Sequence, residues 1–408
     1  MKSSLFRYGL LLGLFSSSTA VFAADAPAAA PADAAPATVA PAAAADSASA
    51  SAARGGRRGA RGTAPAAARG SAPAARGPGG PPATDADKAE MATLMDRPPY
   101  ASGLGDGDYS VGPNYRPAVE ESKRDDVPHG KIVRFVMDSA DSKIFPGSPA
   151  FKRNVAVYIP SQYVPGTPAP LIVTCDQYGL STNTGIFQNT LDNMIADKRL
   201  PAVVAVMIAS GGNERSMEYD TVWGKYAEFV ESEVLPRVEK ETGVTLTKDP
   251  DARMAYGGSS GGIAAFSMAW FHPELYHRVV AFSGTFVNLQ HSDEIPHGGW
   301  QYHESLIANS PVKPLRIWLE MGQNDNGADT ASSNFRNWTI ANKHMGEALK
   351  AKGYHYQLVF AKGAGHTDSK VNQQTIAQAL EFVWKGYPIE PAKDAKAAAT
   401  APAAKTSP

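Results

Sequence analysis

The sequence contains a single cysteine, Cys175, among 408 residues. One cysteine cannot form an intramolecular disulfide or supply the Cys-rich ligand set of a structural zinc site. The chain also lacks an excess of charge of either sign, because 39 Lys and Arg face 40 Asp and Glu, a formal net charge of −1. This balance excludes a globally basic nucleic-acid binder, and we expect no nucleic-acid partner.

No apolar run reaches the roughly 20 residues that a membrane-spanning helix needs. The run from Tyr8 to Phe15 is short; Lys2 and Arg7 precede it, and small residues lead from it to Ala23. A charged region, a short apolar region and a small-residue site in this order are typical of a signal peptide. We therefore predict cleavage near Ala23 and a periplasmic or secreted mature protein without a transmembrane segment.

Large apolar residues are almost absent between Ala24 and Thr84, where Val39 is the only one. Such a stretch cannot bury enough surface to offset its chain entropy. We predict a signal peptide (1–23), a disordered Ala/Pro/Gly/Arg-rich linker and lead-in (24–126), one catalytic domain (127–388) and a disordered tail (389–408). We interpret the linker, with its six arginines, as a flexible spacer. The alternative is an electrostatic arm that binds anionic polymers. The sequence leaves the oligomeric state open.

The region from 127 to 388 alternates short apolar runs with helical periodicity, which predicts an α/β fold. We expect a mostly parallel eight-stranded sheet with helices on both faces and no large cap domain. The predicted strands are Ile132–Val136, Arg153–Ile159, Leu171–Thr174, Ala202–Ala209, Arg253–Tyr256, Val279–Phe282, Leu315–Leu319 and Tyr356–Phe360. Trp300 and Tyr302, between two of these strands, are expected to form a small rim.

A glycine-rich turn, Gly257 to Gly262, lies between a predicted strand and a helix. A nucleophile on a sharp strand-to-helix turn needs glycine on both sides, so that the backbone can bend and the helix can approach the strand. Two frames fit the G-x-S-x-G pattern. The paired glycines favour Ser259 as the nucleophile, and Ser260 is the fallback.

Two further strand ends carry the residue types that a catalytic triad needs. Asp325 follows the strand Leu315–Leu319, and Asp329 and Glu320 are rival acids. His366 follows the last strand in a glycine-rich loop. The chain order serine, acid, histidine is the order that α/β-hydrolases use. We therefore expect Ser259, Asp325 and His366 to be catalytic.

Motifs for metals and cofactors are missing from the sequence. There is no H-E-x-x-H, no phosphate-binding G-x-x-x-x-G-K-[ST] and no Rossmann glycine fingerprint. His291, His297 and His303 share one loop, but their spacing matches no common metal-ligand motif. We expect neither a cofactor nor a metal, and we interpret these histidines as polar loop residues, some of them near the site.

Several segments together resemble the esterase family of α/β-hydrolases that includes enterochelin, feruloyl and acetylxylan esterases, esterase D-like enzymes and mycolyltransferases. These segments are Phe145–Gly147, Val157–Pro160, Leu191–Ile195, Arg215–Asp220 and Gly257–Ile263. The resemblance covers roughly residues 143–387, and it places the family's nucleophile, acid and histidine on Ser259, Asp325 and His366. It also implies that the loop from Thr174 to Gly179 is the oxyanion region.

The expected reaction is hydrolysis of a carboxylic ester through an acyl-enzyme. The ester is either a small molecule or attached to a polymer. Siderophore, feruloyl and acetyl-sugar esters are the candidate substrates. We expect the backbone N–H of Ser260 and one from the Asp176–Gln177 turn to hold the oxyanion. Arg215 either binds a substrate carboxylate or phenolate or forms an ion pair with Glu218 or Asp220. Further predicted substrate-binding residues are Tyr178, Glu218 and Tyr219.

Three other functions stay open at this point. An acyltransferase would use the same triad but pass the acyl group to a hydroxyl acceptor. A lactonase would use it on a cyclic ester. A non-catalytic surface-binding protein is the alternative from a different class, with the arginine-rich linker as its adhesive part.

Overall fold

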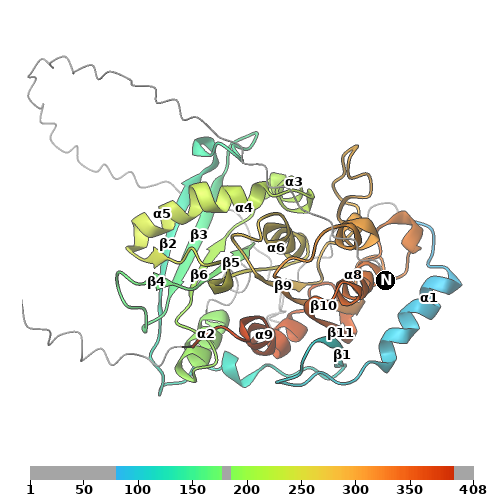
Figure 1. Cartoon of the computed structure of the whole chain (residues 1–408), viewed down its shortest axis with the longest axis horizontal. Helices are drawn as coiled ribbons and strands as arrows, with labels where there is room; N and C mark the ends of the chain where they lie inside the picture. The colour runs from blue at the N-terminus through green and yellow to red at the C-terminus, as the bar shows by residue number, and fades with distance from the viewer. Residues whose placement is uncertain (1–79, 177–184, 390–408) are drawn as a thin grey trace, which may run out of the picture. The chain divides into compact units, whose positions relative to one another are not determined.

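The computed structural model describes residues 80–176 and 185–389 (Figure 1). The strands are β1 (Gly107–Val111), β2 (Lys131–Asp138), β3 (Lys152–Ile159), β4 (Pro168–Ala169), β5 (Leu171–Cys175), β6 (Val204–Ile208), β7 (Thr245–Leu246), β8 (Arg253–Gly258), β9 (Arg278–Phe282), β10 (Arg316–Asn324) and β11 (His355–Gly365). The helices are α1 (Asp85–Ala92), α2 (Ile186–Ala196), α3 (Arg215–Asp220), α4 (Lys225–Phe229), α5 (Leu235–Thr242), α6 (Ser260–Phe271), α7 (Ile307–Asn309), α8 (Trp338–Ala351) and α9 (Ser369–Trp384). The predicted signal peptide, most of the linker, nearly all of the tail, Gln177 and Tyr178 lie outside the described residues.

Nine strands form one sheet in the order β1-β11-β10-β9-β8-β5-β6-β3-β2. The neighbours from β1 to β6 run parallel, whereas β3 and β2 are added antiparallel. The mostly parallel α/β sheet is therefore confirmed, with nine strands in place of the eight expected. β4 and β7 pair separately as a small two-stranded ribbon.

The ninth strand corrects the expected start of the domain. β1 lies in the region predicted as linker and lead-in, yet it pairs with β11 from Gly107 opposite Gln357 to Val111 opposite Ala361. Its sequence, Gly-Asp-Tyr-Ser-Val, has little apolar character. β1 is an edge strand that is held by its backbone pairing with β11. Backbone pairing does not depend on the side chains of β1, so it leaves no periodic pattern in the sequence.

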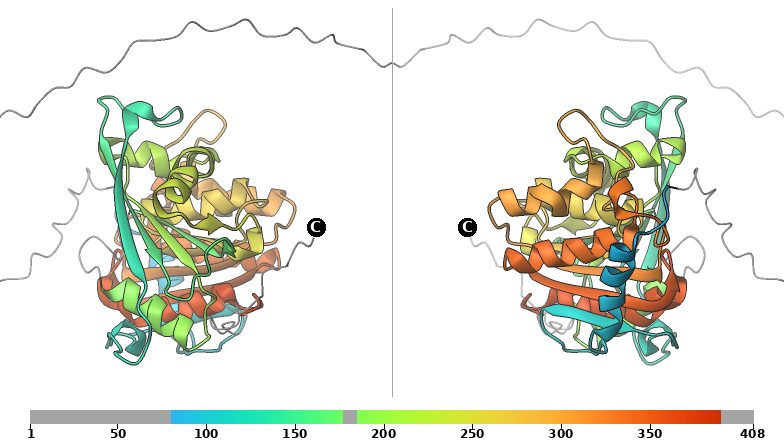
Figure 2. Two further views of the ribbon diagram at one scale, coloured as in Figure 1. Left: turned by 90° about the vertical axis from the view of Figure 1, so that its left-hand side faces the viewer. Right: turned by 90° about the vertical axis from the view of Figure 1, so that its right-hand side faces the viewer.

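Helices cover both faces of the sheet (Figure 2). On one face, α4, α5, α6 and α8 bury an apolar layer that includes Tyr226, Ile263 and Met345. On the other face, α2 and α9 bury a second layer that includes Leu191 and Leu380. Strands covered on both sides read as continuous apolar runs, which is the pattern seen in β5 and β6. Within the described residues, no helix combines the length and apolar character needed to cross a bilayer.

The parallel strands fix where chemistry can take place. β8, β10 and β11 run in the same direction, so the residues that follow them meet at one edge of the sheet. Ser259 directly follows β8, Asp325 directly follows β10, and His366 directly follows β11. The carboxyl edge of an open α/β sheet is where such folds bind ligands.

Candidate active site

Ser259 occupies the sharp turn between β8 and α6. Its backbone has φ 57° and ψ −126°, a conformation that costs energy for a residue with a side chain. The surrounding backbone maintains this conformation, because the Ser259 N–H donates to the carbonyl of Phe282 at 2.9 Å and the Ser259 carbonyl accepts from Thr285 at 3.1 Å. A strained residue between a strand and a helix is typical of a nucleophile elbow.

The glycines around Ser259 allow β8 and α6 to approach each other. A Cβ atom on Gly257 would lie 2.2 Å from the carbonyl oxygen of Gly261. A Cβ atom on Gly262 would meet the Cα of Gly284 at 3.1 Å. Gly257 therefore has no room for a side chain, and a side chain at Gly262 would make a contact tighter than ordinary van der Waals packing.

A continuous chain of hydrogen bonds joins Asp325, His366 and Ser259. His366 Nε2 lies 2.7 Å from Ser259 Oγ, and His366 Nδ1 lies 2.6 Å from Asp325 Oδ1. An ionised carboxylate only accepts hydrogen bonds, so Nδ1 carries the proton and Nε2 accepts from the serine hydroxyl. The three residues thus have the arrangement in which a serine hydroxyl can lose its proton to an imidazole.

Asp325 is fixed by backbone donors on both oxygens. Its side chain is buried, Oδ1 accepts from the Asn326 N–H at 2.7 Å, and Oδ2 accepts from the Gly322 N–H at 3.2 Å. The Trp338 ring packs edge-on against His366 with ring centroids 6.0 Å apart. These contacts restrict the orientation of the Asp325 carboxylate and the His366 ring.

The two rival acids have different places in the structure. Glu320 belongs to β10 and is completely buried, and this burial raises the pKa of its carboxyl well above the usual value. The backbone carbonyl of Asp329 accepts a hydrogen bond from Ala83 at 2.9 Å. Of the three candidates, Asp325 is the one whose carboxylate contacts His366.

The predicted oxyanion donors are described in part. Ser260 is the first residue of α6, so its N–H has no acceptor one turn earlier in the helix. The N–H of Asp176 donates to the Tyr219 hydroxyl at 3.2 Å, so this amide already has an acceptor. Gln177 lies outside the described residues. Of the predicted donors, Ser260 thus has an N–H that the helix itself does not use, adjacent in the chain to Ser259.

Arg215 forms an ion pair with a partner that the sequence did not predict. Its guanidinium contacts both carboxylate oxygens of Asp176, at 2.9 Å from Nε to Oδ1 and 2.5 Å from Nη2 to Oδ2. The expected partners, Glu218 and Asp220, bind elsewhere. Arg215 therefore anchors the turn after β5, where Asp176 has a positive φ of 67°.

Glu218 and Tyr219 are buried, so their placement does not support the predicted contacts with substrate. The Glu218 carboxylate pairs with Arg153 at 2.6 Å, and both side chains are almost inaccessible to solvent. The Tyr219 hydroxyl accepts from Asp176 and lies 3.4 Å from the Tyr226 hydroxyl. Sequence reasoning missed Arg153, although a charged residue on the apolar face of β3, in line with Val155, was a visible indication of a buried ion pair.

Asp220 contacts Ser260, the residue after Ser259. Its Oδ2 accepts from the Ser260 hydroxyl at 3.1 Å and from the Ser216 hydroxyl at 2.7 Å. Burial raises the pKa of this carboxyl to about 6. Asp220 therefore connects α3 to the first turn of α6, directly behind the elbow.

The loop histidines do not converge on one point. His297 Nδ1 lies 2.8 Å from Glu304, and its ring stacks on Phe335. Burial lowers the pKa of His303 to about 3, so this side chain is neutral. Trp300 and Tyr302, expected at a rim, are buried; the Tyr302 hydroxyl lies 2.7 Å from Ser267. The Tyr302 ring packs against Phe266 of α6, and the Trp300 ring packs against Phe335 and against His344 of α8.

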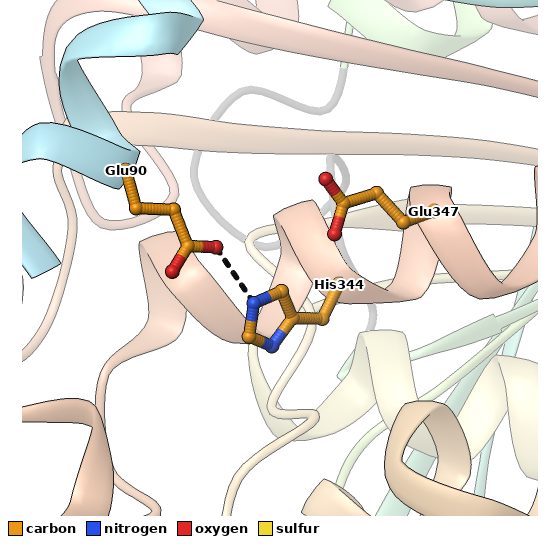
Figure 3. A group of neighbouring side chains, drawn as sticks. All are labelled: Glu90, His344 and Glu347. Carbon is orange, nitrogen blue, oxygen red and sulfur yellow. Dashed lines mark hydrogen bonds and ion pairs between the residues drawn. The ribbon is translucent and has the colours of Figure 1, made fainter. Parts of the chain in front are cut away.

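Among the described residues, one group could hold a metal ion: Glu90, His344 and Glu347, whose potential ligand atoms lie within 4.8 Å of one another (Figure 3). Lys343 changes this interpretation. Its ammonium lies 3.0 Å from Glu90 and 2.5 Å from Glu347, so the two carboxylates already have a cation. We assign no metal to this cluster.

A serine, histidine and aspartate at the carboxyl edge of a mostly parallel sheet with helices on both faces define an α/β-hydrolase. A comparison with family models agrees with this class. The model described as "Putative esterase" matches residues 148–382, more than half of the chain. The chain belongs to this esterase family, and its class is that of carboxylic ester hydrolases.

Individual relatives are distant. The uncharacterized protein YbbA of Bacillus subtilis (strain 168) is 22% identical over 259 residues, 58% of this chain and 94% of that protein. The enterobactin esterase FES of Shigella flexneri has a TM-score of 0.48 and 18% identity, and the match covers 67% of this chain but only 63% of that one. A feruloyl esterase module from Clostridium thermocellum has a TM-score of 0.48 and 16% identity over 72% of this chain and 98% of that one.

Proposed function

We propose that the chain is a serine esterase that hydrolyses its substrate through an acyl-enzyme on Ser259. The observation that carries this proposal is the chain of hydrogen bonds from Asp325 through His366 to the Ser259 hydroxyl, at 2.6 and 2.7 Å. The strained backbone at Ser259 supports it, because strain of this kind is maintained where a nucleophile must project from a turn.

In the proposed reaction, His366 Nε2 takes the proton of the Ser259 hydroxyl while Oγ attacks the ester carbonyl. The negative charge on the carbonyl oxygen is held by the Ser260 N–H, and the expected second donor is the N–H of Gln177, because the Asp176 N–H donates to the Tyr219 hydroxyl. His366 then gives its proton to the departing alcohol, which leaves the acyl group on Oγ. A water molecule attacks the acyl-enzyme by the same steps and releases the carboxylic acid.

Asp325 has no bond-making role in this scheme. Its carboxylate accepts the Nδ1 proton of His366, holds the imidazole in one tautomer and stabilises the imidazolium that forms in each half-reaction. The two backbone donors on Asp325 keep it oriented while the imidazole changes charge.

We propose an ester with a bulky or polymer-attached part as the substrate, and siderophore, feruloyl and acetyl-sugar esters are the candidates. Similarity to proteins named as enterobactin and feruloyl esterases is consistent with this range. Export through the predicted signal peptide belongs to the same proposal, since it would bring the enzyme to extracytoplasmic esters.

A panel of esters tests the proposal. The wild-type protein is incubated with p-nitrophenyl esters of increasing acyl length, methyl ferulate, acetylated xylan and a siderophore trilactone, with Ser259→Ala as the matched control. We expect hydrolysis of at least one ester by the wild type and none by the variant. If the wild-type protein hydrolyses none of the esters in the panel, the proposed hydrolysis is wrong. Product analysis with and without a sugar or lipid hydroxyl acceptor separates hydrolysis from acyl transfer.

A further inference from the structure

A segment ahead of the family match lies against the part of the fold that carries Asp325. We call Pro81–Leu94, which contains α1, the N-terminal strap, and Asp325–Asn337 the acid loop. The family match begins at residue 148, so the strap lies outside it. In the ribbon views the strap runs beside the segment that leads into α8 (Figures 1 and 2).

Backbone hydrogen bonds join the strap to the acid loop. The Ala83 N–H donates to the Asp329 carbonyl at 2.9 Å, and the Ala331 N–H donates to the Pro81 carbonyl at 2.8 Å. These two bonds form a short antiparallel bridge centred on Pro82 and Thr330. The centre of the acid loop is therefore paired with the strap as one strand is paired with another.

A buried carboxylate strengthens this junction. Asp87 is almost fully buried, and its Oδ1 accepts from the Ser332 hydroxyl at 2.6 Å. Its Oδ2 accepts from the Thr84 N–H at 2.8 Å, one half of the capping box of α1, and from the Thr84 hydroxyl at 2.7 Å. Asp87 thus closes the first turn of the strap helix and binds the acid loop at the same time.

One turn further along α1, Glu90 fastens the strap to α8. Its carboxylate lies 2.7 Å from His344 (Figure 3). It also lies 3.0 Å from the Lys343 ammonium. α8 begins at Trp338, whose ring packs against His366. The strap therefore contacts both supports of the imidazole, the loop that carries its acid and the helix that carries its aromatic neighbour.

We propose that Asp87 is a positioning residue of the esterase, which acts through Ser332 to hold the acid loop and so the orientation of Asp325 toward His366. The inference rests on the proposed function. Asp87 touches neither substrate nor reacting atoms, so its effect reaches the chemistry only through the geometry of the triad. Displacement of a catalytic group by about 1 Å can cost as much as about 100-fold in rate.

The test compares Asp87→Ala, Asp87→Asn, Ser332→Ala and the Asp87→Ala/Ser332→Ala double variant in the full chain. Rates are expressed per active site titrated with a fluorophosphonate, so that unfolded protein does not enter the comparison. Asp249→Ala is the matched control, because Asp249 also caps a helical turn, accepting from Asp251 at 3.0 Å, but lies before β8 at the opposite edge of the sheet.

We expect Asp87→Ala to lower kcat by about 10- to 100-fold with little change in KM. Asp87→Asn should recover much of this loss, since the amide oxygen still accepts from Ser332. The double variant should be no slower than the slower single variant, because both changes break the same contact. Asp249→Ala should keep the wild-type kcat per titrated site.

A wild-type kcat in Asp87→Ala, or losses that multiply in the double variant, would overturn the positioning role and leave the proposed function intact. An equal loss in Asp249→Ala would also overturn it, because the effect would then be one of general stability. A wild-type protein that hydrolyses no ester and takes up no fluorophosphonate would reject the proposed function, and the positioning role with it.

Discussion

The Nε2 atom of His366 lies 2.7 Å from the hydroxyl oxygen of Ser259, although 107 positions separate the two residues in the chain. Ser259 directly follows β8 and His366 directly follows β11, with β9 and β10 between these strands in the sheet. β10 extends beyond Glu320, its last residue paired with β9, to Asn324, and β11 extends to Gly365, so that Asp325 and His366 reach Ser259. The contact therefore depends on strand order as much as on the motif around the serine.

Replacing the acid tests its assignment. Asp325→Asn removes the carboxylate that accepts the Nδ1 proton. The imidazole is then no longer held in one tautomer, and its cation is no longer stabilised. We expect kcat to fall by about 10⁴-fold, with thermal unfolding close to wild type. Steady-state kinetics on the best ester of the panel provide the measurement. Asp329→Asn is the control, and the assignment is wrong if that variant loses activity while Asp325→Asn keeps it.

The glycine before the elbow should not tolerate a side chain. In Gly257→Ala the new Cβ would lie 2.2 Å from the Gly261 carbonyl oxygen. The atoms nearest to it belong to the backbone of Gly261, which cannot move aside as a flexible side chain can. We expect a loss of stability of about 3 kcal/mol or more, together with loss of activity, measured by urea unfolding and ester hydrolysis. Gly105→Ala, where nothing lies within 4 Å of the added atom, is the control. Wild-type stability in Gly257→Ala would contradict the packing of β8 on α6.

Buried His303 predicts a loss of stability in acid. Its pKa is about 3 in the folded protein against 6.5 in the unfolded chain, because burial disfavours the cation. The stability from this neutral imidazole is complete above pH 6.5 and is lost as the pH falls toward 3. At pH 5 the loss is about 2 kcal/mol.

Urea unfolding at pH 7 and pH 5 measures this loss. His303→Asn removes the titrating ring, so the difference in unfolding free energy between the two pH values should shrink by about 2 kcal/mol. His291→Asn, at an exposed position that also lies between β9 and β10, is the control. If both variants keep the wild-type difference, His303 does not titrate as its burial predicts.

The pair of Arg215 and Asp176 should be sensitive to a conservative change. A lysine keeps the charge but cannot contact both carboxylate oxygens in a fixed fork, so the turn after β5 loses part of its support. We expect Arg215→Lys to lower kcat/KM by about 10-fold or more. Arg237→Lys, in a pair on the exposed surface of α5, serves as the control. Equal rates for the two variants would show that the pair does not shape the site.

The sequence predicted the features that leave a local pattern. Apolar runs and helical spacing located eight of the nine strands of the main sheet. Glycine-rich turns after strands located Ser259, Asp325 and His366, which the structure brings together. The elements have recognisable patterns because each buries an apolar face whose spacing is set by its own geometry.

Contacts between distant elements could not be predicted in this way. Arg215 pairs with Asp176 and Glu218 with Arg153 because the order of β3, β6 and β5 brings these residues together, and periodicity does not reveal that order. β1 was missed for a related reason, since its place depends on the backbone of β11. Asp87 lies in a segment whose composition favoured disorder, and its partner Ser332 is 245 positions away.

The central claim is that Ser259 is the residue acylated during turnover. Reaction of the full chain with a fluorophosphonate, followed by mass spectrometry of the labelled peptide, tests this claim most directly, with Ser259→Ala and Ser260→Ala in parallel. The account predicts one adduct on Ser259 in the wild type and in Ser260→Ala, and none in Ser259→Ala. An adduct on Ser260, a labelled Ser259→Ala variant or an unlabelled wild type would contradict it.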